Sequence, residues 1–125
     1  MPVALVVDRN VVVRNVIRSI LMPHGFEMLD AANAAEALAL CRSLCSQPID
    51  VLIVEHALGP ETGKAVAGQI LESRPEMQVL VISDLGNASV LEEDGLPPGA
   101  SFLQKPFTAA QLLAAIRNLL EPKIQ

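Results

Sequence analysis

Aromatic side chains are nearly absent from this chain of 125 residues, which has three Phe, no Trp and no Tyr. Proteins that bind single-stranded nucleic acid usually stack the bases on aromatic side chains. Proteins that bind a phosphate backbone need a basic surface, whereas the net charge here is −5. The composition therefore argues against nucleic-acid binding. It also predicts a core of Ala, Val, Leu and Ile, since hydrophobic residues make up 51% of the chain.

Long apolar runs and a basic N-terminus are missing as well. The longest apolar runs are about five residues, far short of the roughly 20 that cross a bilayer. The chain begins MPVALVVDRN, without the basic start of a signal peptide. We therefore expect a cytoplasmic protein. Cysteine is scarce too: Cys41 and Cys45 could supply half of a metal site, but no nearby His or Cys pair completes it.

The apolar residues that are present follow two alternating patterns. Short continuous runs such as VALVV (3–7) and VLIV (51–54) are typical of strands buried on both faces of a sheet. Between them the spacing is helical, and Asn33 followed by Glu36 has the pattern of a helix-capping box. The sequence predicts strands at 3–7, 26–31, 51–54, 79–82 and 101–104, and helices at 11–21, 33–45, 62–73 and 108–120.

Strands that alternate with helices predict a parallel sheet covered on both faces. Because crossovers between parallel strands are right-handed, we favour an open, doubly wound α/β sheet with strand order 2-1-3-4-5. The fourth helix is expected to be degraded. Gly95, Pro97 and Pro98 leave room for at most a short helix, at about 88–94.

Polar residues stand where four of the predicted strands end. Asp8 follows the first strand, Glu55 the third, Ser83 the fourth and Lys105 the fifth. The carboxyl ends of parallel strands meet at one edge of the sheet, where α/β proteins place their sites. The sequence therefore predicts a site that contains two carboxylates, a hydroxyl and an amine.

Five features at fixed separations carry a family resemblance: ALVVD (4–8), DVLIVE (50–55), Gly63 opening a helix, VLVIS (79–83) and FLQKPF (102–107). With these features the whole chain resembles a receiver domain, the module of two-component response regulators. The resemblance implies a flavodoxin-like fold and one domain over residues 1–125. In that family an acidic pair after the first strand holds Mg²⁺. An aspartate that ends the third strand accepts a phosphoryl group from a kinase histidine.

Four residues match functional positions of that family. The resemblance assigns Asp8 to the first position of the acidic pair and Lys105 to the lysine that contacts the phosphoryl group. It assigns Ser83 to the switch hydroxyl and Phe102 to the switch aromatic. It also implies a cis peptide bond between Lys105 and Pro106, which would aim the lysine into the site.

Two residues depart from the family pattern. Arg9 stands where the second acidic residue, a metal ligand, is expected, and Glu55 stands where the acceptor aspartate is expected. Arg9 removes a carboxylate and adds a charge that cannot be neutralised. The Glu55 carboxylate lies about one C–C bond, roughly 1.5 Å, further out than that of an aspartate. A misplacement of about 1 Å can slow a transfer reaction ~100-fold.

We therefore interpret the chain as a pseudo-receiver, a phosphorylation-independent module that acts by protein–protein interaction and not as an enzyme. No cofactor or metal is expected, and Glu55 should form an ion pair with Arg9 or Lys105 instead. The alternative is a working phosphoacceptor that uses Glu55 or Asp84. In that case Mg²⁺ would be held weakly by Asp8 and Glu55.

The expected partners are signalling proteins, such as a histidine kinase or an output protein, and a second copy of the chain in a homodimer. Nucleic acids and membranes are not expected partners. We expect contact through Leu96, Pro97, Pro98 and Phe102, together with the outer face of the last helix.

A nucleotide-binding enzyme is a weaker reading of the sequence. GPETGKA (59–65) follows a strand and opens a helix, as a phosphate-binding P-loop does. Only three residues separate Gly59 from Gly63 where that motif has four, and Ala65 replaces the Ser or Thr that binds Mg²⁺. The chain also has no G-x-G-x-x-G fingerprint of a dinucleotide enzyme.

Overall fold

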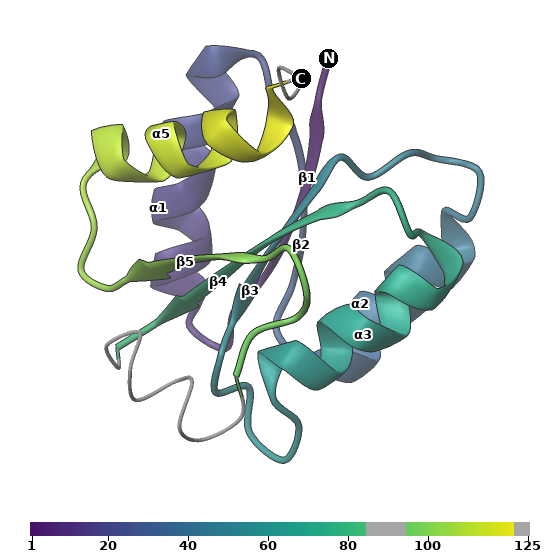
Figure 1. Cartoon of the computed structure of the whole chain (residues 1–125). Helices are drawn as coiled ribbons and strands as arrows, with labels where there is room; N and C mark the ends of the chain where they lie inside the picture. The colour runs from purple at the N-terminus through teal and green to yellow at the C-terminus, as the bar shows by residue number, and fades with distance from the viewer. Residues whose placement is uncertain (85–94, 122–125) are drawn as a thin grey trace.

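The computed structural model describes residues 1–84 and 95–121, and the predicted short helix at 88–94 lies outside these ranges. It contains a five-stranded parallel sheet with the order β2-β1-β3-β4-β5, as predicted (Figure 1). The strands are β1 (Val3–Val7), β2 (Glu27–Ala31), β3 (Val51–Glu55), β4 (Gln78–Ser83) and β5 (Ser101–Gln104).

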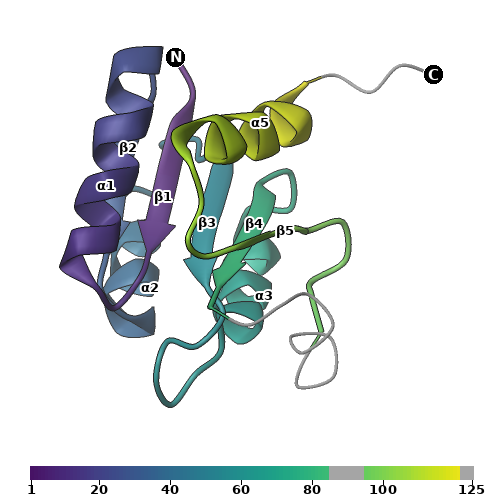
Figure 2. The same ribbon diagram turned by 90° about the vertical axis from the view of Figure 1, so that its left-hand side faces the viewer.

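Helices cover both faces of the sheet. The helices α1 (Val11–Leu21) and α5 (Ala109–Leu120) lie on one face, and α2 (Ala34–Ser43) and α3 (Gly63–Ser73) lie on the other (Figures 1 and 2). A 3₁₀ turn, η1 (Met22–His24), follows α1. Among the described residues, no helix is long and apolar enough to span a membrane.

Alternate residues of each strand supply two separate cores. In β1, Leu5 and Val7 pack in the cluster beneath α2 and α3, while Ala4 and Val6 pack in the cluster beneath α1 and α5. All five residues of β1 are buried. This two-sided burial explains why the strands read as continuous apolar runs rather than as alternating ones.

Side-chain caps set where the helices begin. The side chains of Asn10, Asn33 and Thr62 each accept a hydrogen bond from a backbone N–H in the first turn of the helix that follows. Thr108 and Gln111 form a complete capping box at the start of α5. Such polar caps satisfy backbone donors that have no partner within the helix.

The end of α2 differs from the prediction, because the helix stops at Ser43 and does not reach Cys45. Arg74, the C-cap residue of α3, donates from its guanidinium to the carbonyl oxygens of Cys41, Leu44 and Gln47. These bonds satisfy carbonyls at the helix end that a further turn of α2 would otherwise occupy. A residue distant in sequence therefore ends this helix.

Gly63 allows α3 to begin directly against the end of β3. A Cβ atom at this position would lie 2.3 Å from the carbonyl oxygen of Glu55, closer than such contacts occur. The backbone N–H of Gly63 donates to the carbonyl of His56 over 2.8 Å. The glycine thus lets the backbone that carries Glu55 pack tightly beneath the helix.

Candidate functional site

Three of the predicted site residues meet at the carboxyl edge of the sheet. Asp8 follows β1 and is 0% exposed, and Glu55 is the last residue of β3 and 5% exposed. Lys105 follows β5, and its side chain is 12% exposed. Buried charged groups need partners, since leaving water is costly for an ion. Here the charges pair with one another.

The Glu55 carboxylate is bound on both of its oxygens. Oε1 accepts from the backbone N–H of Arg9 and from its Nε, each over 3.2 Å. Oε2 accepts from Nζ of Lys105 over 3.1 Å. The expected ion pair of Glu55 is therefore present, and it forms with both candidate partners rather than with one.

Lys105 also pairs with the second carboxylate of the site. Its Nζ lies 3.0 Å from Oδ2 of Asp8, so that one ammonium bridges the two buried acids. The backbone N–H of Asn10 donates to Oδ1 of Asp8 over 2.8 Å. The peptide bond between Lys105 and Pro106 is cis, as predicted.

The protonation equilibria follow from these contacts. Burial alone would raise the pKa of Glu55, but hydrogen bonds from Arg9 and Lys105 outweigh it and bring the pKa below its ordinary value. Burial would lower the pKa of Lys105, but Asp8 and Glu55 together raise it. The hydrogen bond to Glu55 raises the pKa of Arg9. All three side chains are therefore charged at neutral pH.

A Mg²⁺ ion does not fit this arrangement of residues. Mg²⁺ takes a compact octahedron of oxygen ligands with one or two carboxylates. The Asp8 and Glu55 oxygens that could serve already face the Lys105 ammonium, and Arg9 adds a second positive charge beside Glu55. Within residues 1–84 and 95–121, no group of three or more His, Cys, Asp and Glu side chains could hold a metal.

The residues at the two predicted switch positions lie on β4 and β5. Ser83 ends β4 and is 4% exposed, and its carbonyl accepts from the backbone N–H of Lys105 over 2.8 Å. Phe102 pairs in register with Val81 and is half-buried, packed against the core beneath α2 and α3. Their roles as switches stay predictions.

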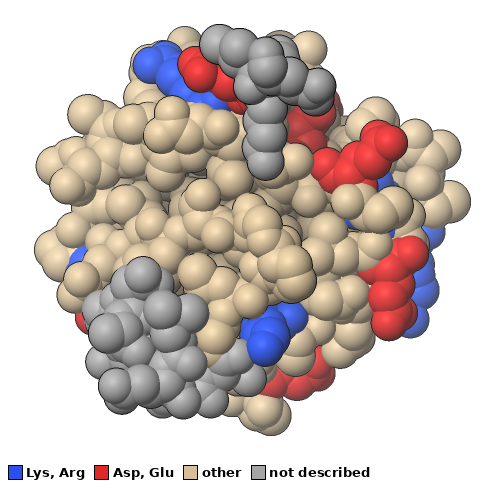
Figure 3. Space-filling view, in the orientation of Figure 1, with Lys and Arg blue, Asp and Glu red and all other residues tan. Residues whose placement is uncertain are grey.

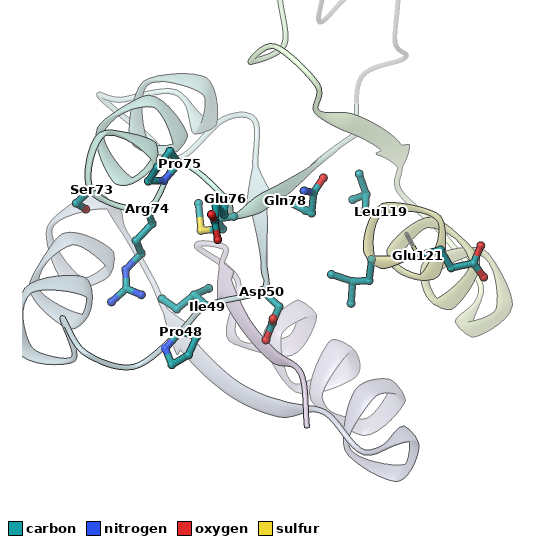
Figure 4. Close-up of a pocket in the computed structure, with 12 residues that line it drawn as sticks. Pro48, Ile49, Asp50, Ser73, Arg74, Pro75, Glu76, Gln78, Leu119 and Glu121 are labelled. Atoms are coloured by element: carbon teal, nitrogen blue, oxygen red, sulfur yellow. The ribbon is translucent and has the colours of Figure 1, made fainter. Parts of the chain in front are cut away.

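A shallow hollow of about 430 Å³ opens above the cluster. Its lining residues come from the ends of several strands and the start of α1: Arg9, Asn10, Val13, Glu55, Asp84 and Lys105. A larger hollow, of about 710 Å³, lies at the opposite edge of the sheet (Figure 4). There the Arg74 guanidinium already binds the end of α2, and Asp50 already accepts from the backbone N–H of Val3. The cluster of buried charges therefore lies at the smaller hollow.

Three polar residues around the site were not identified from the sequence. Asn10 caps α1 and binds Asp8 through its backbone N–H. Arg14 donates to the Asp8 carbonyl oxygen over 2.7 Å and pairs with Asp30 of β2 over 3.0 Å. An Asn before a helical run was a usable signal for the cap. No pattern in the sequence indicated the contact between Arg14 and Asp30.

Known proteins resemble this chain in sequence over most of its length. The regulatory protein VirG of Agrobacterium fabrum is 31% identical over 117 residues, covering 93% of this chain and 45% of VirG. The sensor kinase CckA of Brucella abortus is 26% identical over 121 residues, covering 95% of this chain and 12% of the kinase. This chain thus spans half or less of the length of these relatives.

A solved structure agrees over almost the whole chain. The response regulator receiver protein from Sinorhizobium medicae superposes with a TM-score of 0.82 at 27% sequence identity, covering 95% of this chain and 94% of that one. The family model described as "Response regulator receiver domain" matches residues 4–117. The chain therefore belongs to the family of response regulator receiver domains.

Proposed function

We propose that residues 1–125 form one receiver-like domain that signals by protein–protein interaction without accepting a phosphoryl group. The observation that carries this proposal is the Glu55 carboxylate, whose two oxygens are bound by Arg9 and Lys105. A phosphoacceptor needs a carboxylate oxygen with a lone pair directed at phosphorus, and hydrogen bonds from cations make such an oxygen less nucleophilic. Here each oxygen already serves as the acceptor of a charge-assisted hydrogen bond, the stronger kind.

Metal chemistry supports the same conclusion. Phosphoryl transfer depends on positive charge that neutralises the transferred group, and Mg²⁺ usually supplies it. In this site the positive charge comes from Arg9 and Lys105, which already neutralise Glu55 and Asp8. Two carboxylates facing two cations leave little net charge to attract a divalent ion.

Glu55 would then act as a permanent stand-in for the phosphorylated residue. Its carboxylate reaches beyond the position of an aspartate and contacts Lys105, the residue that the family resemblance assigns to phosphate contact. The imitation is partial, because a phosphoryl group carries more charge and three acceptor oxygens. The domain would hold one signalling state in the cytoplasm and present it to a partner.

Restoring the missing chemistry tests the proposal. The wild-type protein should show no Mg²⁺-dependent change and no phosphorylation by acetyl phosphate at neutral pH, measured by intact mass. Glu55→Asp restores the shorter side chain of the family's acceptor but keeps the positive charge of Arg9 at the metal position. Arg9→Asp removes that charge but keeps the longer side chain of Glu55. Only the double variant should regain both activities, a non-additive result because the two residues share one site. Phosphorylation of the wild type that is lost in Glu55→Gln would refute the proposal.

A second candidate is a working phosphoacceptor with a weakened metal site. The observation that favours it is Asp84, an exposed carboxylate that lines the same hollow as Glu55 and Lys105. Asp84→Asn separates the two candidates. If acetyl phosphate labels the wild type and this variant loses the label, Asp84 is the acceptor.

The proposed partner is a signalling protein, either a histidine kinase, an output protein or a second copy of the chain. The contact surface would combine the half-buried Leu96 and Phe102 and the exposed Pro98 with the outer face of α5. Pro97, which was expected in this surface, is buried in the structure and is left out of it. Figure 3 shows that the surface over α5 and β5 carries few charged side chains, which suits a protein partner more than a nucleic acid. Substitutions that introduce a charged residue at this surface should therefore weaken binding to the partner.

Two substitutions test this surface. Pro98→Glu and Ala114→Glu, both at exposed positions, should each reduce self-association in sedimentation, or capture of a partner that the wild type retains. Leu96 and Ala115 are less suitable, because both are half-buried and pack against the cores. Ala39, an exposed residue of α2 on the other face of the sheet, offers a matched control through Ala39→Glu. If both variants at the proposed surface behave as the wild type does in every assay, the contact surface lies elsewhere.

A further inference from the structure

One peptide group, between Asp8 and Arg9, is held from both sides. Its carbonyl oxygen accepts from Nη1 of Arg14 over 2.7 Å. Its N–H donates to Oε1 of Glu55 over 3.2 Å. Because a trans peptide is planar and its C=O and N–H point in opposite directions, fixing one side of the plane fixes the other. The bond from Arg14 therefore sets the direction of the N–H that binds Glu55.

Arg14 is itself held in place by an ion pair with the edge strand β2. Its Nε lies 3.0 Å from Oδ2 of Asp30, and its side chain is 14% exposed. Asp30 also pairs through Oδ1 with Nη2 of Arg18 over 3.1 Å. Figure 2 shows α1 lying beside β1 and β2, with the β1–α1 turn at the carboxyl end of β1. A chain of polar contacts thus runs from the α1–β2 edge to Glu55.

An arginine is the residue that this geometry requires at position 14. Its planar guanidinium presents several N–H donors at fixed angles, so that Nε can serve the Asp30 carboxylate while Nη1 serves the Asp8 carbonyl. A lysine ammonium at the end of a flexible chain would not hold both acceptors in a fixed relation. Within residues 1–84 and 95–121, Arg18 pairs with Asp30 and makes no contact with the turn.

We propose that Arg14 is a positioning residue, which orients the peptide between Asp8 and Arg9 toward Glu55 and so couples the α1–β2 edge to the site. This inference deepens the proposed function, because it names what sets the geometry of the bound glutamate. A partner or ion that takes Asp30 away from Arg14 would loosen the hold on Glu55. The coupling can be tested without any phosphorylation assay.

Amide hydrogen exchange at Arg9, followed by NMR, reports directly on this peptide. Arg14→Gln should speed exchange of the Arg9 amide about tenfold, the loss expected for a hydrogen bond to a charged acceptor. The amides of β1, such as that of Leu5, should keep their wild-type rates. In Arg14→Lys the exchange rate of the Arg9 amide should lie between the rates in the wild type and in Arg14→Gln. In Arg18→Gln the rate of the Arg9 amide should stay within about twofold of the wild type.

Three outcomes would overturn the inference. The first is an unchanged Arg9 amide in Arg14→Gln. The second is an equal acceleration in Arg18→Gln, and the third is an equal acceleration at Leu5, which would mark a general loss of stability rather than positioning. Glu55→Ala provides a separate check, because it removes the acceptor itself. If that variant leaves exchange of the Arg9 amide unchanged, the Arg9 N–H does not bind Glu55 in solution. The proposed function, which depends on the bound Glu55 carboxylate, is then wrong as well.

Discussion

Replacing Lys105 with methionine tests the charge cluster most severely. The ammonium bridges Asp8, which is 0% exposed, and Glu55, whose side chain is 7% exposed, at 3.0 and 3.1 Å. Methionine keeps much of the chain length but removes the charge. In the variant, Asp8 would lose the cation that it contacts among the described residues. The buried carboxylates of Asp8 and Glu55 would then lie near each other without the ammonium between them. We expect a large loss of stability at neutral pH.

The magnitude follows from the burial of the three groups. Breaking a buried ion pair by removing one partner costs about 3–5 kcal/mol, since an uncompensated charge stays behind. Solvent screening reduces this figure little, because the Lys105 side chain is only 12% exposed. For a domain of this size the loss corresponds to a fall of about 10–20 °C in Tm. That is a large fraction of the ~5–15 kcal/mol that stabilises a typical domain.

The pH dependence gives a second, independent signature. The pKa of Glu55 lies below its ordinary value, so that in the wild type its ionised form adds stability above an unfolded pKa of about 4.3. That contribution is lost as the pH falls through the folded pKa. Without Lys105, burial still raises the pKa of Glu55 while Arg9 alone opposes it. The stability difference between wild type and variant should therefore shrink as the pH falls from 7 toward 4.

Far-UV circular dichroism with urea is the suitable assay, because the chain has no Trp or Tyr for fluorescence. Arg117→Met, at an exposed residue of α5, removes the same charge outside the cluster and should change stability by less than about 0.5 kcal/mol. A loss below about 1 kcal/mol in Lys105→Met at pH 7 would refute the reasoning. A loss that stays constant down to pH 4 would do the same.

Four further substitutions test how the structure around the site is held. Gly63→Ala should lower the free energy of unfolding by several kcal/mol in urea titrations, because the new Cβ would meet the Glu55 carbonyl oxygen at 2.3 Å. Gly68→Ala, in the same helix with open space around it, should instead stabilise by about 0.5–1 kcal/mol. Arg74→Ala should destabilise by about 1–3 kcal/mol in the same assay, since carbonyls at the end of α2 lose their donor. Thr108→Ala should lower Tm through a loss of about 1 kcal/mol as the capping box of α5 is removed.

Much of the fold could be predicted from the sequence, because the signals are local. Continuous apolar runs marked the buried strands, and the polar cap at Asn33 marked the start of a helix. The strand order follows from the parallel arrangement together with right-handed crossovers. The meeting of Asp8, Glu55 and Lys105 was predictable for the same reason, since the carboxyl ends of parallel strands share one edge.

The tertiary structure alone decided how these residues are joined. Periodicity places a side chain on a face or at an edge, but it does not say which of two cations a carboxylate binds, and here Glu55 binds both Arg9 and Lys105. Nor does it show that Arg14 reaches a strand 16 residues away while it holds the turn before α1. The end of α2 depends likewise on Arg74, 30 residues further along the chain. Such contacts depend on distances between elements and on side-chain rotamers, which packing sets only once the whole sheet has formed.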